Sequence, residues 1–338
     1  MPDNDLILEV EHLRKCFDVG KNVQLKAVDD VSFTVRRGEI LGLVGESGCG
    51  KTTLGRTIKQ IYAPTSGTIR FDGQDINSLD RAGRKAYTRK AQMIFQDPYS
   101  SLDPRMTVGE IVSEGMDIHG MYSPSERKRR VNDLLNLVGL SGEHANRFPH
   151  EFSGGQRQRV GIARALAVEP ELIVCDEPIS ALDVSIQAQI VNLFKELRER
   201  LSLTYLFVAH DLSMVKYISD RVAVMYLGRI VEITTSQELY RDPCHPYTEF
   251  LLSAIPIPDP DIEAKKQFER LRGEMPSPID LPRGCSFQNR CPYVSEECRQ
   301  CEMKLREISP GHFAACDKAK RGKTKTRQMI KEERYADS

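Results

Sequence analysis

The chain has 338 residues, with 48 basic (Lys and Arg) and 48 acidic (Asp and Glu) side chains, so its formal net charge is zero. A balanced charge provides no bulk attraction to nucleic acid or to an anionic membrane. The composition, 40% apolar and 28% charged, is typical of a globular protein and excludes disorder over most of the length. At roughly 150 residues per domain, the length favours about two domains.

The apolar runs are too short to cross a bilayer. The longest, such as 40–44 and 172–175, fall far below the ~20 residues that a membrane-spanning helix needs. The first residues are acidic, unlike those of secretory signals and transit peptides. We therefore expect a cytosolic protein, in which another chain provides any membrane span.

The first part of the chain predicts strands and then a helix. Apolar and polar residues alternate over 6–10 and 31–35, as in half-buried strands. The continuous apolar run at 40–44 is typical of a buried parallel strand. A glycine-rich loop follows, then a predicted helix over 51–61, and another short strand is expected at 68–71.

The middle of the chain predicts helices, after which strands return. The pattern is helical from about 101 to 167. Buried strands are expected at 172–175 and 205–209, with an amphipathic helix between them. The segments 222–226 and 229–233 flank a turn and predict a hairpin. Strands that alternate with helices indicate an α/β fold with an inserted helical stretch.

The composition changes after about residue 254. Three prolines between 256 and 260 form a predicted linker, followed by a charged helix over 262–271 and then a cysteine-rich segment. The tail at 318–338 is polar and moderately basic, and we expect it to be mobile.

Residues 45–52 (GESGCGKT) match the pattern G-x-x-x-x-G-K-[ST] between a predicted strand and a predicted helix. Glycines let the backbone wrap around phosphate oxygens, and the helix N-terminus adds partial positive charge. Lys51 is expected to reach the β- and γ-phosphates, and the Thr52 hydroxyl to ligate Mg²⁺. The alternative, a chance glycine-rich turn, does not explain why all these elements occur together. The predicted nucleotide-binding residues of this loop are Gly45, Ser47, Gly48, Cys49, Gly50, Lys51, Thr52 and Thr53.

The predicted strand at 172–175 runs into two carboxylates, Asp176 and Glu177. Acids at the carboxyl end of a parallel strand lie where α/β sheets bind ligands. Asp176 suits the Mg²⁺ shell, and Glu177 suits a general base that orients and deprotonates the attacking water. An acidic surface turn before Pro178 is the alternative, which the phosphate loop makes the weaker explanation.

Residues 152–159 (FSGGQRQR) precede a predicted helix, about 20 residues before the acidic strand. This segment resembles the signature sequence of ATP-binding cassette (ABC) proteins, with Phe152 in place of the usual Leu. Gln96 matches the Q-loop of that family, the segment SALD at 180–183 matches its D-loop, and His210 matches its switch histidine.

The resemblance covers residues 1–255. It implies a P-loop NTPase (RecA-like) core with an antiparallel β subdomain and a helical subdomain at about 97–167. It also implies a head-to-tail dimer, in which each ATP lies between the phosphate loop of one subunit and the Ser-Gly-Gly-Gln turn of the other. A helix that starts at this turn would point its positive end at the γ-phosphate. The residues implied on the turn and the D-loop are Ser153, Gly154, Gly155, Gln156 and Asp183.

The same resemblance assigns roles to three further side chains. Gln96 is implied to reach both the Mg²⁺ ion and the attacking water, and so to join Glu177 as a catalytic residue. His210 is implied to contact the γ-phosphate, with a satisfied core histidine as the alternative. Phe17 is implied to stack on adenine, although a lone phenylalanine at such a place can also be part of the core.

Other stretches resemble, more narrowly, the ATPases of bacterial dipeptide and oligopeptide importers. They are 27–33, 96–105 and 151–152, together with the His-Pro-Tyr-Thr segment at 245–248, which matches the start of the C-terminal extension of that group. The extension is implied to cover 256–317.

Five of the nine cysteines fall within the 32 residues from 285 to 316. The odd total argues against a disulfide framework, and the spacing fits neither zinc ribbons nor ferredoxins. In the importer group the extension resembles a [4Fe–4S]-binding segment, whose pattern maps onto Cys285, Cys291, Cys298 and Cys316. Cys301 is left over, although it can replace Cys298. Zinc and free thiols are the alternatives, and a cluster is expected to be structural.

The primary hypothesis is an ATP-hydrolysing subunit of a bacterial peptide importer. ATP binding closes the dimer, and hydrolysis reopens it. The resemblance implies two transmembrane permeases, a related second ATPase or a second copy, and an external substrate-binding protein. The chain is then peripheral, at the cytoplasmic face of the cell membrane. The cargo stays open between dipeptides, longer peptides and a nickel chelate.

A second hypothesis is a soluble ABC ATPase that acts on nucleic acid or ribosomes. Such proteins usually carry tandem cassettes or a long coiled-coil insertion, which this sequence lacks. The basic tail alone favours this hypothesis, so we expect no nucleic-acid partner. A non-hydrolytic scaffold is a third alternative, and the intact set of catalytic elements argues against it.

Overall fold

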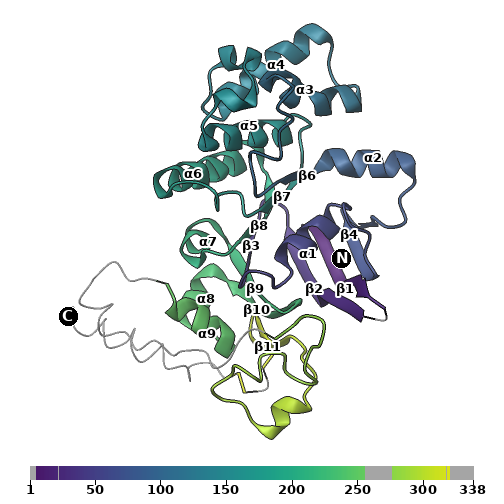
Figure 1. The fold of residues 1–338 in the computed structure, drawn as a ribbon, viewed down its shortest axis with the longest axis vertical. Helices are drawn as coiled ribbons and strands as arrows, with labels where there is room; N and C mark the ends of the chain where they lie inside the picture. Colours follow the sequence, from purple (N-terminus) through teal and green to yellow (C-terminus); the bar gives the residue numbers. More distant parts are fainter. Residues whose placement is uncertain (1–4, 22, 256–275, 317, 320–338) are drawn as a thin grey trace, which may run out of the picture.

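The computed structural model describes residues 5–21, 23–255, 276–316 and 318–319 (Figure 1). The helix expected over 262–271 and nearly all of the 318–338 tail lie outside these residues. Two sheets form the framework. One has eight strands in the order β11-β12-β10-β9-β3-β8-β7-β6, and the other has four in the order β2-β1-β4-β5.

The larger sheet is the central layer. Strands β6, β7, β8, β3 and β9 are parallel neighbours, while β10, β12 and β11 continue the sheet antiparallel. Every residue of β3, β7 and β8 is buried, as in parallel sheets that are covered on both faces. The bounds are β3 (Ile40–Val44), β6 (Ala91–Ile94), β7 (Leu172–Asp176), β8 (Thr204–Ala209), β9 (Arg221–Tyr226), β10 (Arg229–Thr235), β11 (Arg306–Ser309) and β12 (His312–Ala314).

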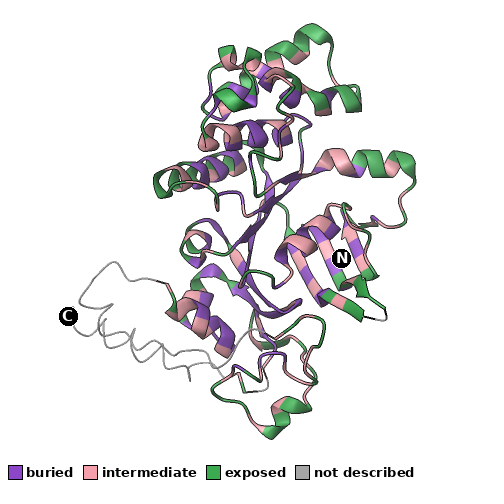
Figure 2. Ribbon diagram, viewed as in Figure 1, coloured by how far each residue is buried: buried purple, intermediate pink, exposed green. Residues whose placement is uncertain are grey.

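The side chains of β3 alternate between two cores. Ile40 and Val44 pack in one core with residues of α3 (Val108–His119), α4 (Pro124–Leu137), α5 (Gly154–Leu166) and α6 (Val184–Leu201), which lie in the upper half of Figure 1. Leu41 and Leu43 pack in the other core, with α1 (Lys51–Ile58) and the smaller sheet. Figure 2 shows the buried residues concentrated along these central strands. Because successive side chains of a strand point to opposite faces of the sheet, β3 contributes to the cores on both faces.

The smaller sheet is antiparallel and covers α1 (Lys51–Ile58). Its strands are longer than the sequence predicted, because β1 pairs with β2 through several register shifts that break the alternation of apolar and polar residues. Helix α1 ends before the predicted residue 61, because Gln60 has a φ of 61° and leaves the helical region. The strand bounds are β1 (Leu6–Gly20), β2 (Val23–Arg36), β4 (Ser66–Phe71) and β5 (Gln74–Asp75).

The remaining helices lie around the larger sheet. Thr107, Ser123 and Ser153 begin α3, α4 and α5 with capping boxes, which fix where these helices start. None of the described helices is long and apolar enough to span a bilayer. The helix bounds are α2 (Arg81–Lys90), α3 (Val108–His119), α4 (Pro124–Leu137), α5 (Gly154–Leu166), α6 (Val184–Leu201), α7 (Leu212–Ile218), α8 (Ser236–Arg241) and α9 (Pro246–Ser253), with short 3₁₀ turns at Gly142–Asn146, Pro149–Glu151 and Glu296–Arg299.

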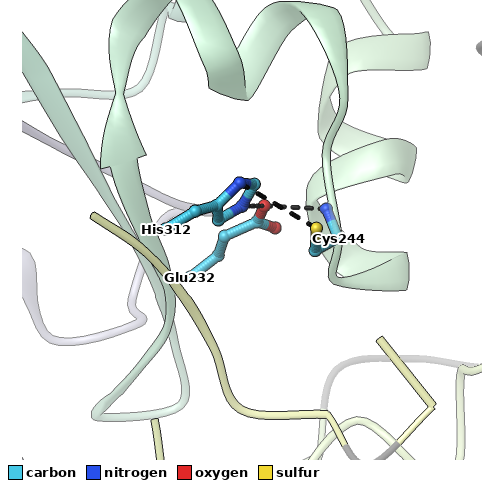
Figure 3. A group of neighbouring side chains, drawn as sticks. All are labelled: Glu232, Cys244 and His312. Atoms are coloured by element: carbon cyan, nitrogen blue, oxygen red, sulfur yellow. Dashed lines mark hydrogen bonds and ion pairs between the residues drawn. The ribbon is translucent and has the colours of Figure 1, made fainter. Parts of the chain in front are cut away.

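The cysteine-rich segment is joined to the rest of the molecule through the larger sheet. Strand β12 pairs with β10, and the buried Glu232 of β10 anchors two segments at once (Figure 3). Its carboxylate accepts hydrogen bonds from the backbone N–H groups of Cys244 (2.7 Å) and His245 (2.9 Å). It also pairs with Nε2 of His312 at 2.7 Å. These contacts account for both carboxylate oxygens, so we assign the group to attachment of the segment.

Candidate nucleotide site

The phosphate loop connects β3 to α1, and close backbone contacts require glycine at two of its positions. A Cβ atom at position 45 would lie 2.2 Å from the carbonyl oxygen of Met225, and one at position 50 would lie 2.0 Å from that of Ala27. Both distances are far below van der Waals contact. The neighbouring strands therefore shape the loop, and only Gly45 and Gly50 fit there.

Lys51 is the first residue of α1, and its side chain is folded into the loop. Its exposure is 4%. The ammonium donates hydrogen bonds to the carbonyl oxygens of Gly45 (2.8 Å) and Glu46 (2.9 Å). The cation thus lies at the amino end of a helix, where backbone N–H groups and the helix dipole attract anions.

Thr52 and Asp176 form a pair at the end of β7. The Thr52 hydroxyl donates a 2.8 Å hydrogen bond to Oδ1 of Asp176. Asp176 is fully buried, and its Oδ2 has no hydrogen-bond partner among the described residues. Burial raises the pKa of this carboxyl group, and the hydrogen bond from Thr52 and the charge of Arg56 oppose that shift. Nε of Arg56 lies 3.9 Å from this oxygen, an ion-pair distance but too long for a hydrogen bond. A hydroxyl beside a buried carboxylate oxygen that lacks a hydrogen bond fits the oxygen ligands that Mg²⁺ prefers.

Three further predicted residues meet at the carboxyl ends of β6, β7 and β8. Gln96 donates from Nε2 to Oε2 of Glu177 at 2.9 Å, and Nδ1 of His210 lies 3.4 Å from the same oxygen. Glu177 has a φ of 45°, in the left-handed region that non-glycine residues seldom adopt. Its backbone N–H donates to the carbonyl of Val208 on β8 at 3.0 Å, which holds this conformation.

The Ser153 turn lies apart from the phosphate loop. Ser153 accepts a hydrogen bond from the backbone N–H of Gln156, whose side chain accepts from the Ser153 N–H at 3.0 Å. A Cβ atom at Gly155 would lie 2.6 Å from Ile186 of α6, so this turn packs directly behind the Asp183 loop. Figure 1 shows α5, which begins at this turn, separated from α1 by strands of the larger sheet. The predicted site residues therefore fall into two groups within one chain.

Comparisons with known proteins match both the cassette and the C-terminal extension. The profile of the family described as "ABC transporter" matches residues 28–180. A second profile, "Oligopeptide/dipeptide transporter, C-terminal region", matches residues 231–298. YkfD of Bacillus subtilis, whose name gives it as a candidate oligopeptide transport ATP-binding protein, is 56% identical over 320 residues, covering 94% of this chain and 97% of its own. The oligopeptide transport ATP-binding protein OppF of the same species is 54% identical, covering 93% and 97%.

The chain belongs to the family of ATP-binding proteins of oligopeptide/dipeptide ABC transporters. As a member of this family it is an ABC-type ATPase, and the family works with membrane permease components.

Solved structures agree with this assignment. A dimeric post-hydrolysis state of the cassette MJ0796, bound to ADP and Pi, superimposes with a TM-score of 0.62 at 30% identity, covering 68% of this chain and 99% of that one. Cassette cbiO1 of Clostridium perfringens, part of the transporter complex cbiONQ, gives a TM-score of 0.62 at 30% identity, covering 70% and 91%. The predicted α/β fold of the P-loop NTPase class is therefore confirmed.

Phe17 of this ATPase lies within β1 and is not part of a loop. Its ring meets that of Tyr62 edge-on, with 5.3 Å between centroids, and the Lys15 ammonium lies 4.8 Å from its centre. The ring is half-buried and its adenine contact stays a prediction.

The four cysteines assigned to a cluster surround one cavity of about 220 Å³ in the ATPase. Cys301 is the only one of the five described cysteines of the segment that does not line it; its thiol donates to the Cys298 carbonyl at 3.4 Å. Burial raises the pKa of Cys285 to about 12 and also raises that of Cys291. Metal binding there would have to displace protons. The cysteines that line the cavity are Cys285, Cys291, Cys298 and Cys316 of this segment, together with Cys244 from outside it.

The sequence did not reveal that this segment reaches the phosphate loop. Arg290 makes a bidentate ion pair with Glu46, 244 residues earlier in the chain. The backbone N–H of Glu46 donates to the Tyr247 hydroxyl at 2.9 Å. Two opposite charges that are far apart in the chain form no periodic pattern and no motif. No sequence signal could therefore have identified this pair.

Proposed function

We propose that the chain hydrolyses ATP as a subunit of a bacterial importer of di- or oligopeptides. It would act at the cytoplasmic face of the membrane with two permeases, an external binding protein, and a related ATPase or a second copy of itself. The main support is the similarity to YkfD and OppF along nearly the whole chain, extension included. Cassettes of other transporters, such as cbiO1, match about two thirds of it.

Nucleotide binding follows from the phosphate loop. We propose that Lys51 exchanges its two carbonyl partners for β- and γ-phosphate oxygens, while the loop N–H groups and the start of α1 face the same charge. Thr52 and Asp176 would hold Mg²⁺, which neutralises charge on the phosphates when it is bound. Their 2.8 Å contact supports this assignment, as does Oδ2 of Asp176, which has no hydrogen-bond partner among the described residues.

Glu177 is the proposed general base for the attacking water. Gln96 and His210 both contact Oε2, so the carboxylate is held by residues that follow the two strands beside β7, namely β6 and β8. Such positioning sets the direction in which the base accepts the water proton. Gln96 also begins the connection from β6 toward α3, through which phosphate occupancy can reach the helical part and a bound permease.

The proposed complete site needs two cassettes. Ser153 caps α5, its glycines begin that helix, and Lys51 begins α1. Figure 1 shows these two helices apart within the chain. A second subunit would bring its own Ser153 turn, with the positive end of a helix, to the γ-phosphate. The match to a cassette whose structure is dimeric and bound to ADP and Pi supports this arrangement.

The catalytic assignment is tested with Glu177→Gln, which keeps the shape of the side chain but removes its basicity. We expect ATP binding to be retained and steady-state hydrolysis to be lost. Glu171→Gln, which removes a surface carboxylate paired with Arg37 and Lys90, is the matched control and should keep normal turnover. Turnover of Glu177→Gln within a few-fold of wild type would remove Glu177 from the role of base.

The cargo is tested by uptake. Cells that lack the chain should lose uptake of labelled di- and oligopeptides, and regain it with the wild-type chain but not with Glu177→Gln. Loss of nickel-chelate uptake with normal peptide uptake would reject the peptide assignment.

We also propose a [4Fe–4S] cluster on Cys285, Cys291, Cys298 and Cys316. These four residues line one cavity, which supports a ligand larger than a single ion. Tetrahedral zinc needs sulfur atoms about 3.8 Å apart. Within the described residues, the only ligand group whose atoms all lie within 4.8 Å is Glu232, Cys244 and His312. The cluster would fasten a segment that has little regular structure of its own.

The cluster proposal is tested by iron and sulfide analysis after anaerobic purification. We expect about four of each per chain. Cys298→Ser should lose the iron, while the matched variant Cys301→Ser, which changes a cysteine outside the cavity, should keep it. Zinc in place of iron, or iron loss in Cys301→Ser alone, would contradict this ligand set.

A further inference from the structure

The phosphate loop is held by a residue of the C-terminal extension. Nη1 and Nη2 of Arg290 donate to the two carboxylate oxygens of Glu46 at 2.7 and 3.0 Å. The Arg290 side chain is 8% exposed and that of Glu46 is 26% exposed. A bidentate and largely dehydrated pair of this kind is stronger and more directional than a surface ion pair.

Glu46 is fixed at three points. Its carboxylate pairs with Arg290, its backbone N–H donates to the Tyr247 hydroxyl at 2.9 Å, and its carbonyl accepts from Lys51 at 2.9 Å. Two of these three partners come from outside the strand–loop–helix unit that forms the phosphate loop. The loop conformation therefore depends on residues far along the chain, one of which, Arg290, belongs to the C-terminal extension.

Arg290 lies on a turn that is held in place by Phe287. The N–H groups of Arg290 and Cys291 donate to the carbonyl of Phe287 at 3.0 and 2.9 Å. Phe287 is 1% exposed, and its ring packs 5.3 Å from that of Tyr226 and 5.5 Å from that of Tyr247. The packing of Phe287 against these two rings therefore fixes the turn, and with it the position of the Arg290 guanidinium relative to the phosphate loop.

We propose that Arg290 is a positioning residue of the ATP site, acting through Glu46. The pair neutralises a carboxylate that would otherwise repel the nucleotide phosphates, and it holds the loop in its binding shape. Since coupling between two sites is reciprocal, bound nucleotide also stabilises the turn that carries Arg290. The extension thereby takes part in nucleotide binding, whether or not its cysteines hold a cluster.

The experiment compares full-length variants for their affinity toward Mg²⁺ with a non-hydrolysable ATP analogue, and for the KM and kcat of ATP hydrolysis. Arg290→Ala should weaken binding roughly tenfold and raise KM, with a smaller change in kcat. Arg290→Lys, which keeps the charge but loses the bidentate geometry, should give an intermediate affinity. Arg299→Ala removes an exposed arginine, paired with Glu296 in the same segment, and should bind as wild type.

A double-variant cycle separates positioning from general destabilisation. Glu46→Ala/Arg290→Ala lacks the unpaired carboxylate, so it should bind nucleotide more tightly than Arg290→Ala alone. Hydrogen exchange supplies a second readout. The analogue should slow amide exchange at residues 285–291 in the wild type but not in Arg290→Ala. Wild-type affinity in Arg290→Ala, additive losses in the double variant, or no effect of nucleotide on exchange in the wild type would each overturn the proposal.

Discussion

The hydroxyl of Thr52 donates a hydrogen bond to the carboxylate of Asp176 and so joins the first turn of α1 to the end of β7. The second oxygen of Asp176 is buried and lacks a hydrogen-bond partner among the described residues. Its nearest cation is Nε of Arg56 at 3.9 Å, beyond hydrogen-bond distance. A buried carboxylate oxygen without a hydrogen bond destabilises a fold unless a ligand compensates for it. This contact therefore links two properties of the chain, metal-dependent nucleotide affinity and stability.

Asp176→Asn should change these two properties in opposite directions. We expect the Mg²⁺-dependent gain in ATP affinity to fall at least about tenfold, because a charged ligand is lost. The free energy of unfolding without nucleotide should stay the same or rise by about 1 kcal/mol, because a buried charge is removed. Nucleotide titrations with Mg²⁺ and with a chelator, and urea unfolding, measure both. Asp72→Asn, at an exposed ion pair with Arg37, is the control. Unchanged Mg²⁺ dependence would exclude Asp176 as a ligand.

Gln96→Ala removes the 2.9 Å hydrogen bond to Glu177 and leaves the carboxylate oriented by His210 alone. We expect kcat to fall by roughly one to two orders of magnitude and KM to change little, because the contact directs the base. Steady-state ATPase kinetics measure both constants. Gln92→Ala, on β6 shortly before Gln96, should leave both near wild type. A raised KM with an unchanged kcat would instead assign Gln96 to substrate binding.

His245 should make the fold sensitive to acid. Burial lowers its pKa to about 4, and its Nδ1 accepts a hydrogen bond from the Tyr247 N–H at 3.1 Å. In the unfolded chain His245 binds a proton near pH 6.5, whereas in the folded chain it does so only near pH 4. The stabilisation is therefore complete above pH 6.5 and is lost as the pH falls toward 4, by about 3 kcal/mol in total.

Urea unfolding across this pH window measures the effect. His245→Asn, which keeps an acceptor near the Nδ1 position, should lower stability at neutral pH but show a shallower loss toward acid. His12→Gln, at a histidine whose side chain is 81% exposed, should keep the wild-type slope. Equal slopes for His245→Asn and the wild type would contradict the assignment.

Parts of the fold that follow one local pattern could be predicted from the sequence. The strand at 40–44 is found at the predicted residues. A short, continuous apolar run is typical of a strand that is buried on both faces of a sheet. Helix α2 was missed, since Tyr87 is its one buried residue and it lacks an apolar stripe. The short strands β11 and β12 were missed as well, because β12 is held by pairing with β10 rather than by its own alternation.

The candidate site shows the same division. Lys51, Thr52, Asp176 and Glu177 could be proposed because their spacing relative to strand ends follows from how a P-loop works. The contacts within the site, such as that of Gln96 with Glu177, could not be predicted. They depend on the strand order β8-β7-β6, which the sequence does not reveal. Arg290 could not be anticipated at all, because its partner Glu46 is distant in sequence and is reached only when β12 docks on β10.

The two-subunit ATP site is tested most directly by mixing two inactive variants of the full chain. Lys51→Ala disables the phosphate loop, and Ser153→Arg disables the turn that serves the opposite subunit. Each should be inactive alone, while a mixed dimer contains one site with neither change, so an equimolar mixture should regain up to about a quarter of wild-type ATP turnover. A mixture that stays as inactive as its components would contradict a site shared between two copies of this chain. A Ser153→Arg chain that hydrolyses ATP at the wild-type rate would contradict a shared site with either kind of partner.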